Sequence, residues 1–484
     1  MTQTDFIVLL PALLLSGWAC ALMLVDLLIP AERKWLTGWL ALAGVAVSAL
    51  GLMAWPSVGH VPAFLGMIVA DGYSLFLNLI FLFSAAIAIL LALSYLPRVN
   101  LERGEFYVLL LFTVTGMMLM AQATDLIVVF LALELLSIPL YIMAGLARPR
   151  LSSEESAMKY FLLGAFASGF LVYGIALTYG ATQTTHLTTI LSTIQAQKDV
   201  RGLLVAGAAL ILVGLGFKVA AVPFHMWTPD VYEGAPSVVT AFMSVGAKAG
   251  GFAALLRVFV TAFPELSTQW AGAAAIIAAL TMILGNFAAI AQSNIKRLLA
   301  YSSISHAGYI LMGLVASGDA SVSDFAVGSV LFYLMAYALT TLGTWAVVMA
   351  VERQEGAGLA IEDYAGLAAR QPALALAMAL FMLSLTGLPP TVGFVGKFYV
   401  FRATLDANGG AYVWLAIVGV LTSLVSAYYY LRVIVMMWMR EGEGRALSQP
   451  VLNFAVAVTA IGTFILGLFP MPLIDLATRL VLAR

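Results

Sequence analysis

The sequence predicts an all-α protein that crosses a membrane about fourteen times and forms one transmembrane domain over residues 1–484. Hydrophobic residues make up 63% of the chain and charged residues only 10%, whereas a soluble domain carries roughly a quarter charged residues. Apolar runs of about twenty residues recur along the whole chain, and each can cross a hydrocarbon core of about 30 Å. Membrane is therefore the expected solvent for almost all of this protein.

Apolar runs and the turn residues between them place the helices in order. Helices 1 to 3, within residues 1–100, are expected near 6–29, 35–55 and 73–96. Helices 4 to 8, within residues 104–262, are expected near 106–122, 125–146, 157–180, 202–226 and 236–262. Helices 9 to 13, within residues 270–440, are expected near 270–292, 297–317, 325–350, 372–403 and 411–438. Helix 14, within residues 451–484, is expected near 452–478.

The basic residues in the predicted loops divide unequally between the two sides of the membrane. Most of them, from Arg33 and Lys34 to Arg440 and Arg445, fall in alternate loops that lie on one side. Because cytoplasmic loops carry an excess of Lys and Arg, these loops are expected in the cytoplasm and both termini outside. The first apolar run has no positive residue ahead of it, so we interpret it as a retained helix rather than a cleaved signal.

The chain shows no signature of a cofactor of its own. Cys20 is the only cysteine, which excludes an intrachain disulfide, an iron–sulfur cluster and a cysteine zinc site. Neither a phosphate-binding loop nor a dinucleotide fingerprint is present, and no residue cluster has metal-ligand or hydrolase spacing. We therefore expect no cofactor in this chain and no nucleic-acid partner.

Charged residues inside the predicted helices are the strongest functional signal. An ionised side chain near the bilayer centre is costly unless it is paired, hydrated or neutralised, and such residues are usually functional. One acid, Glu134, lies in the middle of helix 5. The basic residues within predicted helices are Lys159, Lys218, Lys248, Arg257, Lys397 and Arg432.

Two helices contain their own breakers next to a lysine. Pro223 follows Lys218 by five residues in helix 7, and Pro389 and Pro390 precede Lys397 in helix 12. Proline frees a backbone carbonyl, which is tolerated at depth only against protein or water. Two broken helices five helices apart predict two five-helix repeats, helices 4–8 and 9–13. Repeats of an odd number of helices must be inverted relative to each other, a common plan of transporters.

Glu134 and Lys218 form a candidate proton-transfer pair. A nearby opposite charge favours the ionised form of each group, whereas burial favours a neutral lysine that can gain and lose a proton. The alternatives are a protonated Glu134 that bonds a neighbouring carbonyl, and a Lys218 that extends to the membrane interface. Lys248 is a candidate in helix 8, with the alternative that it only bonds unwound carbonyls of helix 7. Lys397 fits a functional residue and an interfacial lysine equally well.

Two histidines could link these lysines. His225 follows Pro223 at the break of helix 7, and His306 lies among hydroxyl residues in helix 10. A histidine between hydroxyls and water suits a proton relay, although a lone helical histidine is more often a packing residue. Arg257 and Arg432 lie near helix ends and are expected to extend to the interface, and Lys159 is either a relay entrance or an interfacial charge.

Four stretches resemble the antiporter-like membrane subunits of respiratory complex I. They are LALELLSIPLYIMAG, GFKVAAVPFHMWTPDVYEGAPSVVTAFMSVGAKAG, QSNIKRLLAYSSISHAGYILMG and LSLTGLPPTVGFVGKFYVF. The resemblance spans helices 5 to 12 and implies fourteen helices with two inverted five-helix repeats. The residues that match the family's proton-transfer positions are Glu134, Lys218, Lys248, Lys397, His306 and His225. Within the family, the lysine at 397 disfavours the subunit that has a glutamate at this position. The end of the chain soon after helix 14 disfavours the subunit that extends into a long lateral helix.

The resemblance also implies the setting of this chain. It predicts a subunit in a bacterial cell inner membrane, with other membrane subunits of the complex and membrane lipids as partners. FMN, iron–sulfur clusters and quinone are expected in other subunits, so that quinone reduction elsewhere drives proton transfer here. The nearest alternatives are a subunit of a multisubunit sodium/proton antiporter, a relative that serves a membrane-bound hydrogenase, a non-pumping assembly subunit and a solute symporter.

Overall fold

The computed structural model describes residues 2–55, 59–196, 201–352 and 357–480. Within these ranges the fold is helical, apart from one short hairpin of β1 (Val61–Ala63) and β2 (Ile68–Ala70). Thirteen helices are long and apolar enough to cross a membrane. The predicted class, an all-α polytopic membrane protein, is therefore confirmed. The hairpin was not predicted, because strands of three residues are too short to be recognised in a hydropathy profile.

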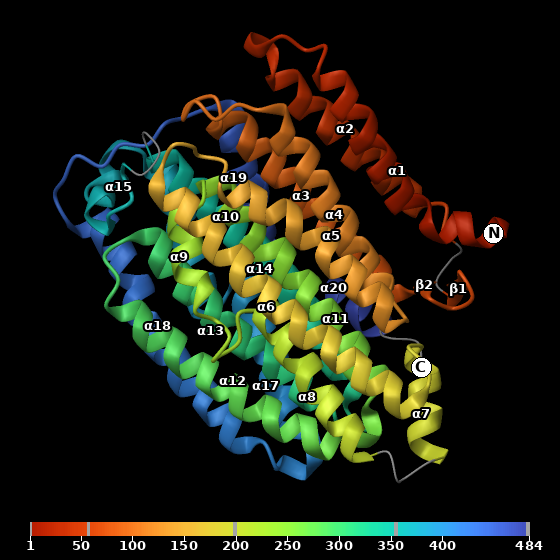
Figure 1. Cartoon of the computed structure of the whole chain (residues 1–484). Helices are drawn as coiled ribbons and strands as arrows, with labels where there is room; N and C mark the ends of the chain where they lie inside the picture. The colour runs from red at the N-terminus through yellow and green to blue at the C-terminus, as the bar shows by residue number, and fades with distance from the viewer. Residues whose placement is uncertain (1, 56–58, 197–200, 353–356, 481–484) are drawn as a thin grey trace.

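Helices α1 (Gln3–Asp26), α2 (Trp35–Leu52) and α3 (Gly72–Tyr95) come first. Helix α3 begins at Asp71, whose carboxylate accepts a hydrogen bond from the backbone N–H of Ser74 at 2.8 Å, as a helix N-cap residue does. Helices α1 and α2 pack against each other at one edge of the molecule, coloured red in Figure 1. Helix α3, in contrast, is largely buried.

The predicted first group of helices contains a broken helix beside a lysine. Its elements are α4 (Gly104–Gln122), α5 (Leu126–Ala144), α6 (Leu151–Thr182), α7 (Leu187–Ala196), α8 (Arg201–Lys218), α9 (Trp227–Gly234), α10 (Ser237–Phe242), a π-helical turn at Met243–Ala247 and α11 (Lys248–Thr261). Helix 7, expected near 202–226, is α8 and ends at Lys218; the non-helical stretch that follows contains Pro223, and α9 begins beyond the expected span, at Trp227. The π-helical turn directly before Lys248 was not predicted; such turns recur at functional sites.

The predicted second group resembles the first in having a broken helix with a lysine beside the break. Its elements are α12 (Ser267–Ile290), α13 (Ile295–Ala316), α14 (Ser323–Val351), α15 (Leu367–Arg370), α16 (Pro372–Thr386), α17 (Val392–Asp406) and α18 (Val413–Met439). Predicted helix 12 consists of α16 and α17, separated at the predicted pair of prolines. The helix count of fourteen, the inversion of the repeats and the boundaries 1–100, 104–262, 270–440 and 451–484 stay predictions.

The end of the chain corrects one expectation. Helix 14, expected near 452–478 as one span, is two helices, α19 (Pro450–Leu468) and α20 (Met471–Arg479). The reason is Pro470 with Pro472, because proline removes backbone donors and starts a new helix more readily than it continues one. Helix α20 packs against α3 and α14.

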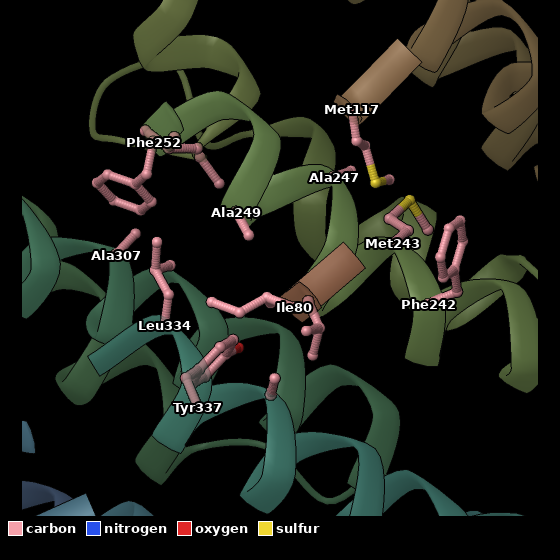
Figure 2. Close-up of a cluster of buried hydrophobic side chains, with 14 of the residues drawn as sticks. Ile80, Met117, Phe242, Met243, Ala247, Ala249, Phe252, Ala307, Leu334 and Tyr337 are labelled. Carbon is pink, nitrogen blue, oxygen red and sulfur yellow. The ribbon is translucent and has the colours of Figure 1, made fainter. Parts of the chain in front are cut away.

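Helices α11, α13 and α14 form the centre of the molecule. Nearly every residue of α11 and α13 is buried, whereas α1, α6 and α19 expose most of theirs to the surroundings. Figure 2 shows the apolar packing there, with Ile80, Met117 and Phe252 among the side chains that meet between α3, α4, α11 and α14. The charged side chains described below project into this otherwise apolar core.

The position of Arg257 near a helix end predicted that its side chain extends to the membrane interface. The structure shows that this prediction is wrong. Arg257 is 2% exposed, and its Nη1 and Nη2 donate to the carboxylate of Asp71 at 2.6 and 3.0 Å. The guanidinium also donates to the carbonyl of Ala121 and lies over the ring of Tyr73. A fully paired arginine of this kind joins α11 to the start of α3 and the end of α4.

We predict that Arg257→Met destabilises the protein strongly, because it leaves the buried carboxylate of Asp71 without its partner, a loss of about 3–5 kcal/mol. The measurement is the thermal stability of the purified protein. The matched control is Arg402→Met, which breaks a half-exposed ion pair with Asp406 and should cost about 1 kcal/mol or less. Equal losses in the two variants would contradict a structural role for the Arg257–Asp71 pair.

Candidate functional site

Lys218 lies at the point where α8 unwinds. It is the last residue of α8, and Ala220 just after it has a φ of 62°, so the chain leaves the helix at once. The side chain of Lys218 is 3% exposed. Its Nζ donates to the Oγ of Ser137 at 2.8 Å and to the hydroxyl of Tyr160 at 3.1 Å. The expectation that this lysine could extend to the interface is wrong.

Glu134 lies one turn before Ser137 on α5. Its Oε1 accepts a hydrogen bond from the Oγ of Ser168 on α6 at 2.5 Å. Among the described residues Glu134 and Lys218 do not form a direct ion pair, although they are close enough to interact electrostatically. A cavity of about 10 Å³ lies between Ser168 and Lys218, which is the space that a single water needs.

Lys248 points into the interface between α11 and α13. It is 2% exposed, and its Nζ donates to the carbonyl and to the Oγ of Ser303, each at 2.5 Å. The alternative that it bonds unwound carbonyls of helix 7 is wrong, because the carbonyl belongs to α13. The Nζ also lies 6.0 Å from the centre of the Tyr337 ring on α14.

His306 occupies the space between Lys248 and Lys397. Its Nδ1 lies 2.8 Å from the hydroxyl of Tyr333, and its Nε2 lies 3.2 Å from the hydroxyl of Tyr430. Both lysines are within electrostatic range of its ring. A cavity of about 10 Å³, lined by His306, Tyr333 and residues of α16 and α17, lies beside it. Hydroxyls on both ring nitrogens and room for one water fit the predicted relay.

Lys397 also points inward, which overturns the interfacial alternative. It is 5% exposed, and its Nζ donates to the carbonyl of Thr386 at 2.8 Å and to the Oγ of Ser423 at 2.7 Å. The ammonium lies 4.6 Å from the centre of the Tyr309 ring. Thr386 is the last residue of α16, so the break of helix 12 supplies the carbonyl that this lysine uses.

Gly387 shapes the contact between the break and Lys397. Its φ is +88°, and a Cβ at this position would lie 2.8 Å from the Cδ of Lys397. A side chain at residue 387 would therefore carry backbone strain and also displace the lysine.

The remaining predicted residues lie apart from these contacts. His225 lies in the break between α8 and α9 beside the carbonyl of Pro223, and among the described residues it makes no hydrogen bond to Lys218. Lys159 forms ion pairs with Glu155 and Asp230, each at 2.6 Å, as an interfacial charge does.

Arg432 donates to the carbonyls of Ile290 and Gln292 at the end of α12. A cation at the C-terminus of a helix satisfies its last carbonyls. The expected extension of Arg432 to the interface stays a prediction.

The sequence reasoning missed the hydroxyl residues that contact the lysines and His306. They are Ser137, Tyr160, Ser303, Tyr333, Ser423 and Tyr430. Ser303 and Ser137 carried a signal, since each lies three residues from a predicted site residue, His306 or Glu134, and therefore shares its helix face. The others come from distant helices and from common residue types, so no local pattern marks them.

The comparisons with known proteins agree on one family. The family described as "NADH:quinone oxidoreductase/Mrp antiporter, TM" matches residues 123–426. The chain belongs to this family. A protein of Chloroflexus aggregans named NADH-quinone oxidoreductase subunit N is 48% identical, and the match covers 98% of this chain and 97% of that protein. Another with the same name, from Trichlorobacter lovleyi, is 46% identical, with 98% and 96% covered. The resemblance recognised in the sequence is thereby confirmed, including the subunit N branch that Lys397 favoured.

Solved structures give the same result for the fold. A chain of respiratory complex I from Thermus thermophilus, with bound aureothin, has 36% sequence identity and a TM-score of 0.82, and the match covers 97% of this chain and 99% of that chain. A chain of the Mrp complex from Dietzia sp. has the same TM-score at 20% identity, with 99% and 97% covered. The second match shows the shared fold alone.

We predict that Gly387→Ala lowers the midpoint of thermal unfolding of the purified protein more than Gly409→Ala does. Both glycines have a positive φ, but a Cβ at Gly409 meets no atom within 4 Å. The αL conformation costs roughly 1–2 kcal/mol in each variant, and only Gly387→Ala adds the collision with Lys397. Equal shifts in the two variants would show that Lys397 moves aside without cost.

Proposed function

We propose that this chain is a proton-translocating membrane subunit of an NADH–quinone oxidoreductase in a bacterial cell inner membrane. The observation that carries the proposal is the setting of Lys218, Lys248 and Lys397. Each is buried in the membrane interior and bonded to hydroxyls or carbonyls, without a carboxylate within ion-pair distance among the described residues. A lysine whose partners are neutral oxygens is not held in its charged form by an ion pair, and unlike an arginine it can both gain and lose a proton.

The proton route begins, in this proposal, at Lys218 and ends at Lys397. A change in the position or charge of Glu134 alters the electrostatic stabilisation of the ammonium of Lys218, which then loses or regains a proton. Lys248 and Lys397 exchange protons through His306, whose two ring nitrogens face hydroxyls. His225 has the weakest support, because among the described residues it makes no hydrogen bond to any of these groups.

The energy for this transfer comes from elsewhere in the proposed complex. FMN, iron–sulfur clusters and quinone would reside in other subunits, and this chain would couple to quinone reduction through contacts with other antiporter-like subunits and lipids. The chain would act as part of a translocase, with helices 4–8 and 9–13 as inverted repeats. Both termini would then lie in the periplasm and the basic loops in the cytoplasm.

We predict that Lys218→Ala and Lys218→Arg both lower proton translocation per NADH oxidised in proteoliposomes of the purified complex. Alanine removes the proton carrier, and arginine keeps the positive charge but does not release a proton in proteins. Normal assembly is checked by recovery of the complex from the membrane. Pumping at the wild-type ratio in an assembled Lys218→Ala complex would refute the role of this lysine. If Lys218→Arg pumped at the wild-type ratio and Lys218→Ala did not, translocation would require the positive charge at residue 218 and not proton exchange by it.

We predict that the tagged chain, purified in mild detergent, brings with it flavin- and iron–sulfur-containing subunits and NADH–quinone oxidoreductase activity. Absorbance of the cofactors and the subunits in the preparation are the measurement. A set of small membrane proteins with no redox cofactor would instead support the sodium/proton antiporter alternative. The shared fold of the Mrp complex makes that comparison necessary.

A further inference from the structure

Glu352 is a buried acid that the proton route above does not use. It follows the last residue of α14 directly and is 0% exposed. Its Oε2 accepts a hydrogen bond from the Oγ of Ser237 at 2.6 Å, and its Oε1 accepts one from the hydroxyl of Tyr95 at 3.1 Å. The carboxylate therefore joins the end of α3, the start of α10 and the end of α14.

Basic groups surround this end of the helices. Arg98 stacks on the ring of Tyr95, donates to the carbonyl of Met349 and is within electrostatic range of Glu352. Lys296, which is also buried, donates to the carbonyl of Ala235 at 2.6 Å. The basic loops that the positive-inside rule assigns to the cytoplasm lie at this end. Glu352 therefore lies at the end of a membrane-spanning helix, on the side of the basic loops.

A row of hydroxyls leads from Glu352 toward Lys248 along α10 and the π-helical turn. Ser237 and Thr240, three residues apart in α10, share a helix face. Ser244 lies four residues further along, inside the π-helical turn, and Lys248 follows that turn directly. All three hydroxyl residues are 0% exposed. The rise of a helix puts about 16 Å between the first and the last of these positions.

A second row lies on α14, which packs against α10 and the π-helical turn. Tyr337, Thr341 and Thr344 share a helix face by the same spacing. The two rows meet at both ends, because Ser237 bonds Glu352 at one end and Lys248 lies against the ring of Tyr337 at the other. The two helices are therefore connected at the two ends of these rows, at Ser237 with Glu352 and at Lys248 with Tyr337.

We propose that Glu352 is the group through which Lys248 is recharged with protons from the side of the basic loops, an inference that rests on the proposed function. The protonated carboxyl of Glu352 gives its proton to the hydroxyl of Ser237, and transient water between the two rows carries a proton to the neutral amine of Lys248. The amine becomes an ammonium, and the carboxylate regains a proton from water at the membrane surface. The π-helical turn next to Lys248 replaces regular helix along this path.

The test compares Glu352→Gln with Glu352→Asp in the complete complex in proteoliposomes. Glutamine keeps the size of the side chain and one accepting oxygen for the hydroxyl of Ser237 or Tyr95, but it cannot carry a proton. Aspartate keeps the proton and loses one methylene. A proton-transfer role predicts that Asp pumps better than Gln, and a purely structural role predicts the reverse order. For Glu352→Gln we expect proton transfer to slow by about tenfold or more, since loss of a positioned acid–base group typically costs 100-fold or more.

Two controls separate the possible results. Glu362→Gln changes an exposed acid on the same side of the fold and should pump at the wild-type rate. Lys248→Ala tests the proposed function itself. Wild-type pumping by Glu352→Gln, together with loss in Lys248→Ala, would overturn the role of Glu352 and leave the proposed function standing. Wild-type pumping by both would overturn both.

If Glu352→Gln fails to assemble, Ser237→Ala replaces it in the test. This variant keeps the carboxyl and removes the hydroxyl that joins it to α10, so slower pumping in an assembled complex supports the route. Unchanged pumping by Ser237→Ala overturns it.

Discussion

The high cost of an ammonium group inside a lipid bilayer underlies the architecture of this protein. Hydrocarbon supplies no oxygen, so each buried lysine must receive one from the protein. Lys397 uses the carbonyl of Thr386, which the end of α16 leaves available, together with the Oγ of Ser423. Lys248 uses both oxygens of Ser303. Broken helices and hydroxyl side chains are therefore the features that allow these charges in the membrane.

Helix α13 connects these sites. Ser303, His306 and Tyr309 follow at three-residue intervals and share one face of the helix. The first contacts Lys248, the second contacts hydroxyls from α14 and α18, and the third lies under Lys397. A helix that is buried almost throughout holds these groups rigidly, because its neighbours pack against it on every side.

Two kinds of buried charge coexist in the fold. Arg257 is bonded to a carboxylate and to a backbone carbonyl, and an arginine in this setting stays charged. Lys218, Lys248 and Lys397 are equally buried but bonded to neutral oxygens. Equal burial therefore has different consequences. Arg257, paired with a carboxylate, links helices, whereas the three lysines, bonded to neutral oxygens, are the groups proposed above for proton exchange.

The amino-acid sequence by itself determined the membrane class, the helices that carry the charges, the two breaks beside Lys218 and Lys397, and the family. These follow from local features, since an apolar run, a proline and a buried charge each have a physical cost that is visible along the chain. Only the tertiary structure decided which residues meet. Lys218 bonds Ser137 and Tyr160 rather than Glu134, Arg257 finds Asp71, and Glu352 reaches Ser237. Such contacts join helices far apart in sequence through common hydroxyl residues, and helix packing alone brings them within hydrogen-bonding distance.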